Sequence, residues 1–176
     1  MKYFAYAEKM FCAHMYHTVP HAKCLGVVKI MGYKIAFHNR GSQDFSGKCN
    51  IVPVSDPKCE VYGVLYDIPE QERSLLDKDQ SLGFGNQEIT LRVFPVDENP
   101  LIAPNGLFAF TYVAYKDNIF EDLVPYTWYK KLILSGAKEH QLPAEYIYRL
   151  EQFSSTQDPN VHRETKQKRY LGSLLS

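Results

Sequence analysis

Apolar residues gather in short runs along the first part of the chain and predict β-strands. The opening run KYFAYA (2–7) is aromatic-rich and predicts a buried strand. Four further runs have the same character: CLGVVKI (24–30), YKIAFHN (33–39), CNIVPV (49–54) and CEVYGVLYDI (59–68). Met31 and Gly32 stand between two of these runs and predict a hairpin there. Residues 55–57, Ser-Asp-Pro, predict a turn.

Helical patterns follow these runs. Helices are predicted in three segments: PEQERSLLDKDQ (69–80), YTWYKKLILSGA (126–137) and PAEYIYRLEQF (143–153). The first has Pro69 at its first helical position and acidic residues in its first turn. We expect its Leu75 and Leu76 to face inward. The second is expected to end at Gly136, because glycine commonly terminates helices.

The order of the elements predicts the fold class. Strands are also predicted in QEITLRVFPV (87–96) and GLFAFTYVAY (106–115), whereas 9–19 is either a short helix or a loop. Strands with interspersed helices and no βαβ rhythm predict an α+β domain with a mainly antiparallel sheet or barrel. We place this domain in residues 1–153 and interpret the polar, basic segment 154–176 as a peripheral tail.

Charge and hydropathy narrow the choice of partners. The chain has 176 residues, which is enough for one domain with its own core. Its 20 Lys and Arg balance 20 Asp and Glu, and this argues against nucleic acid or an anionic membrane as the main partner. The sequence shows neither the apolar run of a signal peptide nor an apolar stretch of about 18 residues. A cytoplasmic protein that binds a small molecule is therefore expected, with its oligomeric state open.

Cysteine and histidine spacing predicts no metal site and no other cofactor. The four cysteines are Cys12, Cys24, Cys49 and Cys59, and no CxxC pair is present. His14 and His17 share one helical face, but no carboxylate or cysteine pattern completes a metal site around them. Cys12 could serve as a nucleophile, yet no histidine partner is visible. Free thiols in a reducing compartment are the simpler interpretation.

Four motifs within residues 2–150 carry a family resemblance. They are YFAYAEKM (3–10), VYGVLY (61–66), LDKDQS (76–81) and the run from Tyr129-Lys130-Lys131 through Gly136-Ala137 and Leu142-Pro143 to Tyr146. The first resembles the Y-x-A-Y-G-S-N-[ML] loop of the γ-glutamylcyclotransferase family, which includes AIG2-like proteins. The second resembles the family's middle strand, and the third its L-D-x-x-E-G helix end. The fourth matches Y-K-K-x-I-x-x-G-A-x-x-x-x-L-P-x-x-Y almost completely and is the most specific.

The resemblance implies both a fold and a reaction. The fold is a small, mainly antiparallel β-barrel flanked by helices, with an anion-receptive cavity beside the first loop. Family members release 5-oxoproline from γ-glutamyl compounds, because the α-amino group attacks the γ-carbonyl. A glutamate accepts the proton and then donates it. Backbone N–H groups of the G-S-N loop hold the substrate and stabilise the developing oxyanion.

The chain departs from the family pattern at both chemical positions. Gln80 stands where the family has its glutamate, and an amide does not take up a proton at neutral pH. Ala7-Glu8-Lys9 replaces the G-S-N tripeptide and adds two opposite charges. We interpret Glu8 as a relocated base that acts across the same cavity. The alternative is that Glu8 pairs with Lys9 or points to solvent.

The remaining candidate site residues each have a second interpretation. Gln80 either hydrogen-bonds a substrate amide or fills the space of the missing glutamate. Lys9 either binds a substrate carboxylate or phosphate, or is a solvated surface lysine. Tyr129 either reaches the pocket, as the matching family tyrosine does, or belongs to the core. The substrate-binding set predicted by the resemblance is Tyr6, Ala7, Lys9, Met10 and Tyr129.

Three functional hypotheses follow. The leading one is a repurposed γ-glutamylcyclotransferase-like enzyme that acts on a small carboxyl- or amide-bearing metabolite by proton transfer at Glu8. Cyclisation, elimination and cleavage of an acyl–amine bond all suit such a site, and a role in a biosynthetic pathway would account for the altered residues. The second is a non-catalytic protein that binds a small molecule. The third is a true γ-glutamylcyclotransferase with a relocated base.

Overall fold

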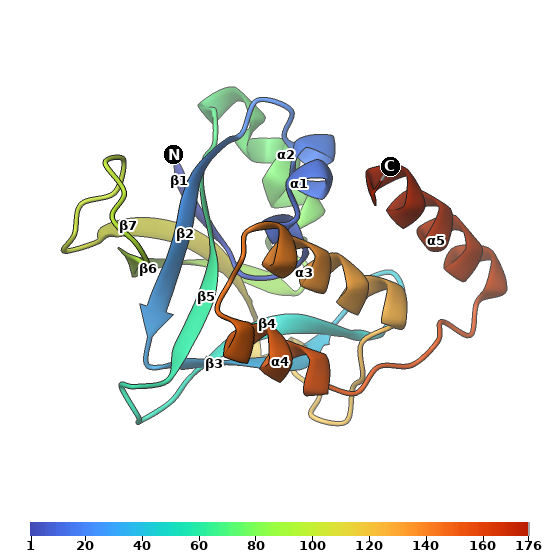
Figure 1. Ribbon diagram of the computed structural model, residues 1–176. Helices are drawn as coiled ribbons and strands as arrows, with labels where there is room; N and C mark the ends of the chain where they lie inside the picture. Colours follow the sequence, from blue (N-terminus) through green and yellow to red (C-terminus); the bar gives the residue numbers. More distant parts are fainter. Residues whose placement is uncertain (176) are drawn as a thin grey trace.

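The computed structural model describes residues 1–175 and contains seven strands and five α-helices (Figure 1). The strands are β1 (Lys2–Ala5), β2 (Lys23–Met31), β3 (Tyr33–Arg40), β4 (Gly47–Pro53), β5 (Glu60–Asp67), β6 (Asn86–Pro95) and β7 (Leu107–Ala114). The α-helices are α1 (Cys12–Thr18), α2 (Arg73–Asp79), α3 (Thr127–Glu139), α4 (Ala144–Gln152) and α5 (Val161–Leu175). Short 3-10 turns are η1 (Glu8–Met10), η2 (Glu70–Glu72) and η3 (Lys116–Asn118). The ambiguous segment 9–19 is therefore mostly helical.

Five strands close into a barrel in the order β1-β5-β2-β6-β7. Neighbouring strands are antiparallel, except where β1 pairs in parallel with β7 at Tyr3 and Phe110 and so closes the barrel. Strand β5 lies between two partners and carries the fully buried Val64, Leu65 and Tyr66. The predicted α+β class and the mainly antiparallel barrel flanked by helices are confirmed.

The hairpin predicted at Met31 and Gly32 is wrong. β2 already pairs with β5 and β6, so neither of its edges is available to β3. β3 pairs with β4 instead, in a separate two-stranded sheet. Gly32 has φ 75° and forms a corner between the two sheets, where its N–H donates to the carbonyl of Cys59. The strands themselves were predicted close to their observed bounds.

Two expectations about helices also need correction. Leu76 is fully buried, but Leu75 is 47% exposed, because adjacent residues on a helix point in different directions. Gly136 does not end α3, which continues to Glu139. A Cβ on Gly136 would lie 2.4 Å from the backbone N of Phe11 and 2.7 Å from the carbonyl carbon of Met10. Glycine at this position thus allows α3 to approach the loop after β1 closely.

The C-terminal segment packs against the domain. Helix α5 lies beside α3 at the red end of the chain (Figure 1), and its Leu171 packs with Phe11 and Leu132. The boundary at residue 153 stays a prediction, but the segment beyond it is not simply a solvated end. None of the helices described in residues 1–175 is long and apolar enough to cross a membrane.

Candidate active site

A cavity of about 720 Å³ opens beside the end of β1. Its walls come from the loop after β1 and from α1, from the end of β3 and the start of β4 with the loop between them, from the end of α2 and the turn after it, and from the helices α3 and α5. Five of the predicted site residues line it: Tyr6, Ala7, Glu8, Gln80 and Tyr129. Lys9 and Met10 are not among the described residues that line it. The structure thus brings together most of the site that the resemblance implied.

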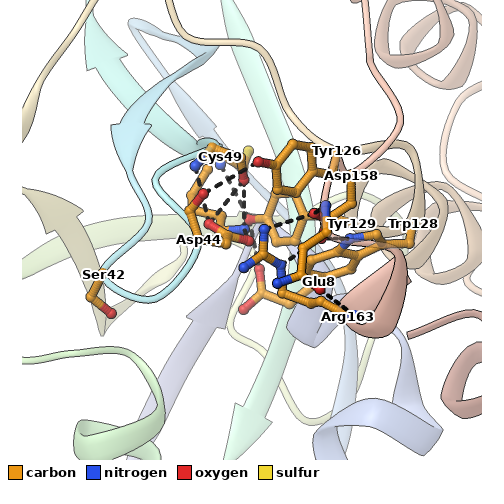
Figure 2. A network of polar contacts seen from close by, with 12 residues as sticks. Glu8, Ser42, Asp44, Cys49, Tyr126, Trp128, Tyr129, Asp158 and Arg163 are labelled. Carbon is orange, nitrogen blue, oxygen red and sulfur yellow. Dashed lines mark hydrogen bonds and ion pairs between the residues drawn. The ribbon is translucent and has the colours of Figure 1, made fainter. Parts of the chain in front are cut away.

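The Glu8 carboxylate is held by two hydrogen bonds at the cavity wall. Gln80 Nε2 donates to Oε1 at 2.9 Å, and the Tyr129 hydroxyl donates to Oε2 at 2.9 Å. The same hydroxyl accepts the N–H of Cys49 at 3.2 Å, which fixes its orientation. Figure 2 shows Tyr129 and Glu8 side by side. Burial, together with the charge of Glu8, raises the pKa of Tyr129, so the hydroxyl keeps its proton and acts as a donor.

Gln80 connects two carboxylates. Its amide nitrogen has two protons, and these are directed to Glu8 Oε1 and to Asp79 Oδ2 at 3.0 Å. A glutamate at position 80 would instead place a third carboxylate beside these two. The amide therefore suits a site in which the carboxylate comes from Glu8, and it orients that carboxylate directly.

Lys9 is buried, so the expectation of a solvated surface lysine is wrong. Its side chain is 1% exposed, and Nζ lies 3.0 Å from Asp79 Oδ2, 2.6 Å from the hydroxyl of Thr18 and 3.3 Å from His14 Nε2. Burial alone would raise the pKa of Asp79, but the charge of Lys9 and the hydrogen bond from Gln80 lower it. Lys9 therefore pairs with Asp79 behind the cavity wall, where all three of its partners line the cavity but Lys9 itself does not.

Tyr6 and Met10 fix the loop from both ends. The Tyr6 hydroxyl donates to the carbonyl of Tyr112 at 2.6 Å. Met10 is fully buried, and its carbonyl accepts hydrogen bonds from the Tyr66 hydroxyl at 3.2 Å and from His140 Nε2 at 2.9 Å. Met10 therefore holds the loop in place, and a contact between it and a substrate stays a prediction.

Lys48 is a cavity residue that the sequence analysis missed. Its Nζ lies 2.6 Å from Asp44 Oδ2 and above the rings of Trp128 and Tyr129, at 4.9 and 4.6 Å from their centroids. Burial lowers the pKa of Lys48, while the Asp44 carboxylate opposes the shift. Lys48 supplies a cation near Glu8 that could attract an anionic group. No motif marks it, because it lies at the start of β4, between the motifs that resemble the family.

Helix α5 contributes to this side of the cavity, and the ion pair between its first turn and Asp158 fixes its start. Arg163 donates to both oxygens of Asp158, at 2.5 and 2.7 Å, and Trp128 Nε1 donates to the same carboxylate at 3.3 Å (Figure 2). Further along α5, the Tyr170 hydroxyl lies 2.8 Å from His14 Nδ1, and Tyr170 lines the cavity. The predicted tail thus contributes to the wall of the candidate site.

Cys12 has a histidine partner, contrary to the expectation from spacing. Its Sγ lies 3.3 Å from Nε2 of His140, at the end of α3. The pair is not part of the cavity lining. Sequence spacing does not reveal it, because the two residues are far apart along the chain.

Comparison with known proteins agrees with the fold and with the motifs. The sequence profile of the AIG2-like family matches residues 60–150, just over half of the chain. Proteins named gamma-glutamylcyclotransferase from Bos taurus and Homo sapiens are each 27% identical to the chain, over 154 and 151 residues. Each alignment covers 84% of this chain and 76% of the relative.

A solved structure of a gamma-glutamyl cyclotransferase shares the fold with a TM-score of 0.80. Its sequence is 24% identical, and the match covers 96% of this chain and 98% of that one. A second structure, of a protein from Homo sapiens, gives a TM-score of 0.78 at 23% identity, over 95% of this chain and 97% of that one. Together with the family profile, these results show that the chain belongs to the AIG2-like family.

Proposed function

We propose that the protein is an enzyme of the γ-glutamylcyclotransferase type in which Glu8 acts as proton acceptor and donor. The observation that carries the proposal is the position of the Glu8 carboxylate, which lines the cavity one hydrogen bond, 2.9 Å, from Gln80. The resemblance places the family's catalytic glutamate at position 80. The Glu8 carboxylate therefore lies about one hydrogen-bond length from the position of the family's glutamate. This is close enough to reach a substrate bound in the same cavity.

The environment of Glu8 suits proton transfer. Gln80 and Tyr129 each direct a donor at one of its oxygens, so the carboxylate is oriented before a substrate arrives. Each oxygen also has a second lone pair that can accept a proton. The cation of Lys48 provides attraction for the carboxylate that a γ-glutamyl-type substrate carries.

The proposed reaction transfers an acyl group from one amine to another within the substrate. Glu8 removes a proton from the substrate's α-amine, whose nitrogen then attacks the γ-carbonyl carbon. Backbone N–H groups of the loop 7–9 stabilise the oxyanion that forms. The protonated Glu8 then gives its proton to the departing amine as the old amide bond breaks. The products are a cyclic lactam and a free amine, and Glu8 returns to its starting state.

The substrate is proposed to be a small carboxyl- or amide-bearing metabolite, with γ-glutamyl amines and dipeptides as the first candidates. The names of the relatives support this choice. Ala7 and Glu8 replace the first two of the G-S-N residues in the cavity lining, which favours a substrate that differs from the family's usual one. A biosynthetic role in the cytoplasm remains part of the proposal, and the four free cysteines suit a reducing compartment.

The test is release of 5-oxoproline, followed by mass spectrometry, from γ-glutamyl dipeptides and amines. The wild type is compared with Glu8→Gln and with the control Glu98→Gln, which removes an exposed carboxylate. We expect Glu8→Gln to lower turnover by about 10²–10⁴-fold, as loss of a general base does, while Glu98→Gln has no effect. Ligand-induced thermal stabilisation should persist in Glu8→Gln, since the cavity is unchanged.

The other outcomes separate the alternatives. Equal turnover in wild type and Glu8→Gln would refute the role of Glu8. Thermal stabilisation by these compounds with no product from the wild type would favour a non-catalytic binding protein. Absence of both would retire γ-glutamyl compounds as ligands.

A further inference from the structure

Three potential metal ligands lie close together near the loop after β1, on the side that faces away from the cavity. The sulfurs of Cys12 and Cys24 and a ring nitrogen of His140 all lie within 4.8 Å of one another. Cys12 begins α1, Cys24 lies in β2, and His140 follows α3. All three side chains are partly exposed, so an ion could reach them from solvent. The cluster is built from three separate elements of the fold.

The spacing of these atoms agrees with tetrahedral coordination. Zinc binds thiolate sulfur at about 2.3 Å and imidazole nitrogen at about 2.0–2.1 Å. In a tetrahedron, these bond lengths place sulfur and nitrogen about 3.6 Å apart and two sulfurs about 3.8 Å apart. Cys12 Sγ and His140 Nε2 are 3.3 Å apart, and the Cys24 sulfur lies within 4.8 Å of both. Small rotamer adjustments would bring the three atoms around one ion.

Glu139 lies beside this group of three, outside the 4.8 Å within which their ligand atoms meet, and its carboxylate is a candidate fourth ligand. Its Oε2 lies 3.8 Å from His140 Nε2 and accepts the backbone N–H of Cys12 at 2.9 Å. Two oxygen or nitrogen ligands on tetrahedral zinc are about 3.4 Å apart, so a carboxylate oxygen is close to a ligand position. A set of two thiols, one imidazole and one carboxylate is typical of zinc and not of magnesium or calcium.

Neighbouring polar groups contact two of these candidate ligands, Cys12 and His140. The hydroxyl of Tyr66 lies 3.5 Å from Cys12 Sγ, within reach of a thiolate ligand. His140 Nε2 also lies 2.9 Å from the carbonyl of Met10, and a metal bond would replace this contact. The cost of one neutral hydrogen bond is small relative to the affinity of structural zinc sites.

We propose that Cys12, Cys24 and His140, with Glu139 as the fourth ligand, form a binding site for a zinc-type divalent cation. On binding, each thiol releases its proton to solvent, and the ring nitrogen bonds to the ion through its lone pair. None of the four residues lines the cavity, so the site is independent of the proposed reaction at Glu8. By joining α1, β2 and α3, the ion would stabilise the folded chain.

The test uses Co²⁺ as a spectroscopic probe on the full chain, after reduction with a non-thiol reductant and removal of metals. We expect one equivalent of Co²⁺ to produce sulfur-to-cobalt charge-transfer absorption and the visible bands of tetrahedral cobalt, and Zn²⁺ to displace it. Cys24→Ser and His140→Asn should each weaken Co²⁺ binding at least tenfold. Cys59→Ser, the matched control at a cysteine outside the cluster, should leave it unchanged.

A second measurement needs no variant. Zn²⁺ should protect Cys12 and Cys24 of the wild type from alkylation, mapped by peptide mass spectrometry, but not Cys59. The proposal is overturned if Co²⁺ gives no charge-transfer absorption, or if the absorption persists in Cys24→Ser and His140→Asn. It is also overturned if Cys12 and Cys24 yield only a mutual disulfide under mild oxidation and are not protected by Zn²⁺.

Discussion

Glu8 and Cys12 lie in one short segment after β1, yet their side chains enter two different chemical environments. Glu8 lines the cavity, where an amide and a phenol donate to its oxygens. Cys12 lies on the other side, with a second thiol and an imidazole beside its sulfur. Oxygen and nitrogen groups around an open cavity suit an organic substrate, whereas sulfur and imidazole in a compact cluster suit a soft cation.

The difference shows how one loop can carry the two proposed sites on opposite sides. Helix α3 contributes to both sides, through Tyr129 near its start and His140 just beyond its end. Gly136 lets the helix approach the loop between these two points. We therefore expect changes on the cavity side to leave metal binding intact. Three variants on that side follow in order of decreasing expected effect, and the first also tests metal binding.

Replacing the buried lysine should have the largest effect on stability. Lys9→Met leaves Asp79 without its ion-pair partner inside the protein. Breaking a fully buried pair costs 3–5 kcal/mol, and because the Asp79 side chain is 34% exposed we expect about 2 kcal/mol. Urea denaturation measures this loss. Co²⁺ binding at Cys12 should stay within about threefold of the wild type.

The control for this variant is Lys138→Met, which breaks an exposed ion pair with Glu151. Surface pairs contribute about 0–1 kcal/mol, so its effect should be much smaller. Equal losses in the two variants would show that the Lys9 pair does not hold the site together.

Removing the Tyr129 hydroxyl should have an intermediate effect on both stability and turnover. Tyr129→Phe leaves the buried N–H of Cys49 without an acceptor, at a cost of about 1–2 kcal/mol. It also removes one donor from Glu8, and we expect turnover to fall about tenfold. Tyr146→Phe is the matched control, because its hydroxyl bonds the carbonyl of Tyr62 away from the cavity. A similar loss of turnover in both variants would contradict a specific role for Tyr129.

The smallest predicted effect concerns pH. Burial, with the nearby charge of Lys9, lowers the pKa of His14 from 6.5 to about 4. The unfolded chain therefore binds this proton more readily, and the folded protein should lose stability as pH falls from about 6.5 to 4. We expect His14→Gln to reduce that loss by about 1 kcal/mol, measured by denaturation at several pH values. The exposed His162→Gln should follow the wild type, and an unchanged slope in His14→Gln would refute the prediction.

Much of the fold could be predicted from the sequence, because local patterns set the elements. Short apolar runs predicted the strands, and the motif that ends at Tyr146 predicted the family. The pairing at Gly32 could not be predicted, since it depends on β5 and β6 occupying both edges of β2. The role of Gly136 was missed for a similar reason, because its constraint comes from the loop that packs against α3.

The residues of the candidate site likewise include some that sequence motifs could predict and some that they could not. The family resemblance of the two motifs that contain Glu8 and Gln80 implied that their side chains share a cavity, and the structure places them in hydrogen-bond contact. Lys48 could not be found from a motif, because it reaches the cavity from another part of the chain. The residues of the cysteine–histidine cluster lie on separate elements, so no local sequence spacing predicts it.

Moving the carboxylate tests the central claim most directly. The claim is that Glu8 supplies the carboxylate that the family carries at position 80. Turnover of the best γ-glutamyl substrate is measured for wild type, Glu8→Gln, Gln80→Glu and the double variant Glu8→Gln/Gln80→Glu. The account predicts that Glu8→Gln is about 10²–10⁴-fold slower and that the double variant recovers most of this loss. A double variant that folds and binds ligand but is as slow as Glu8→Gln would contradict the account.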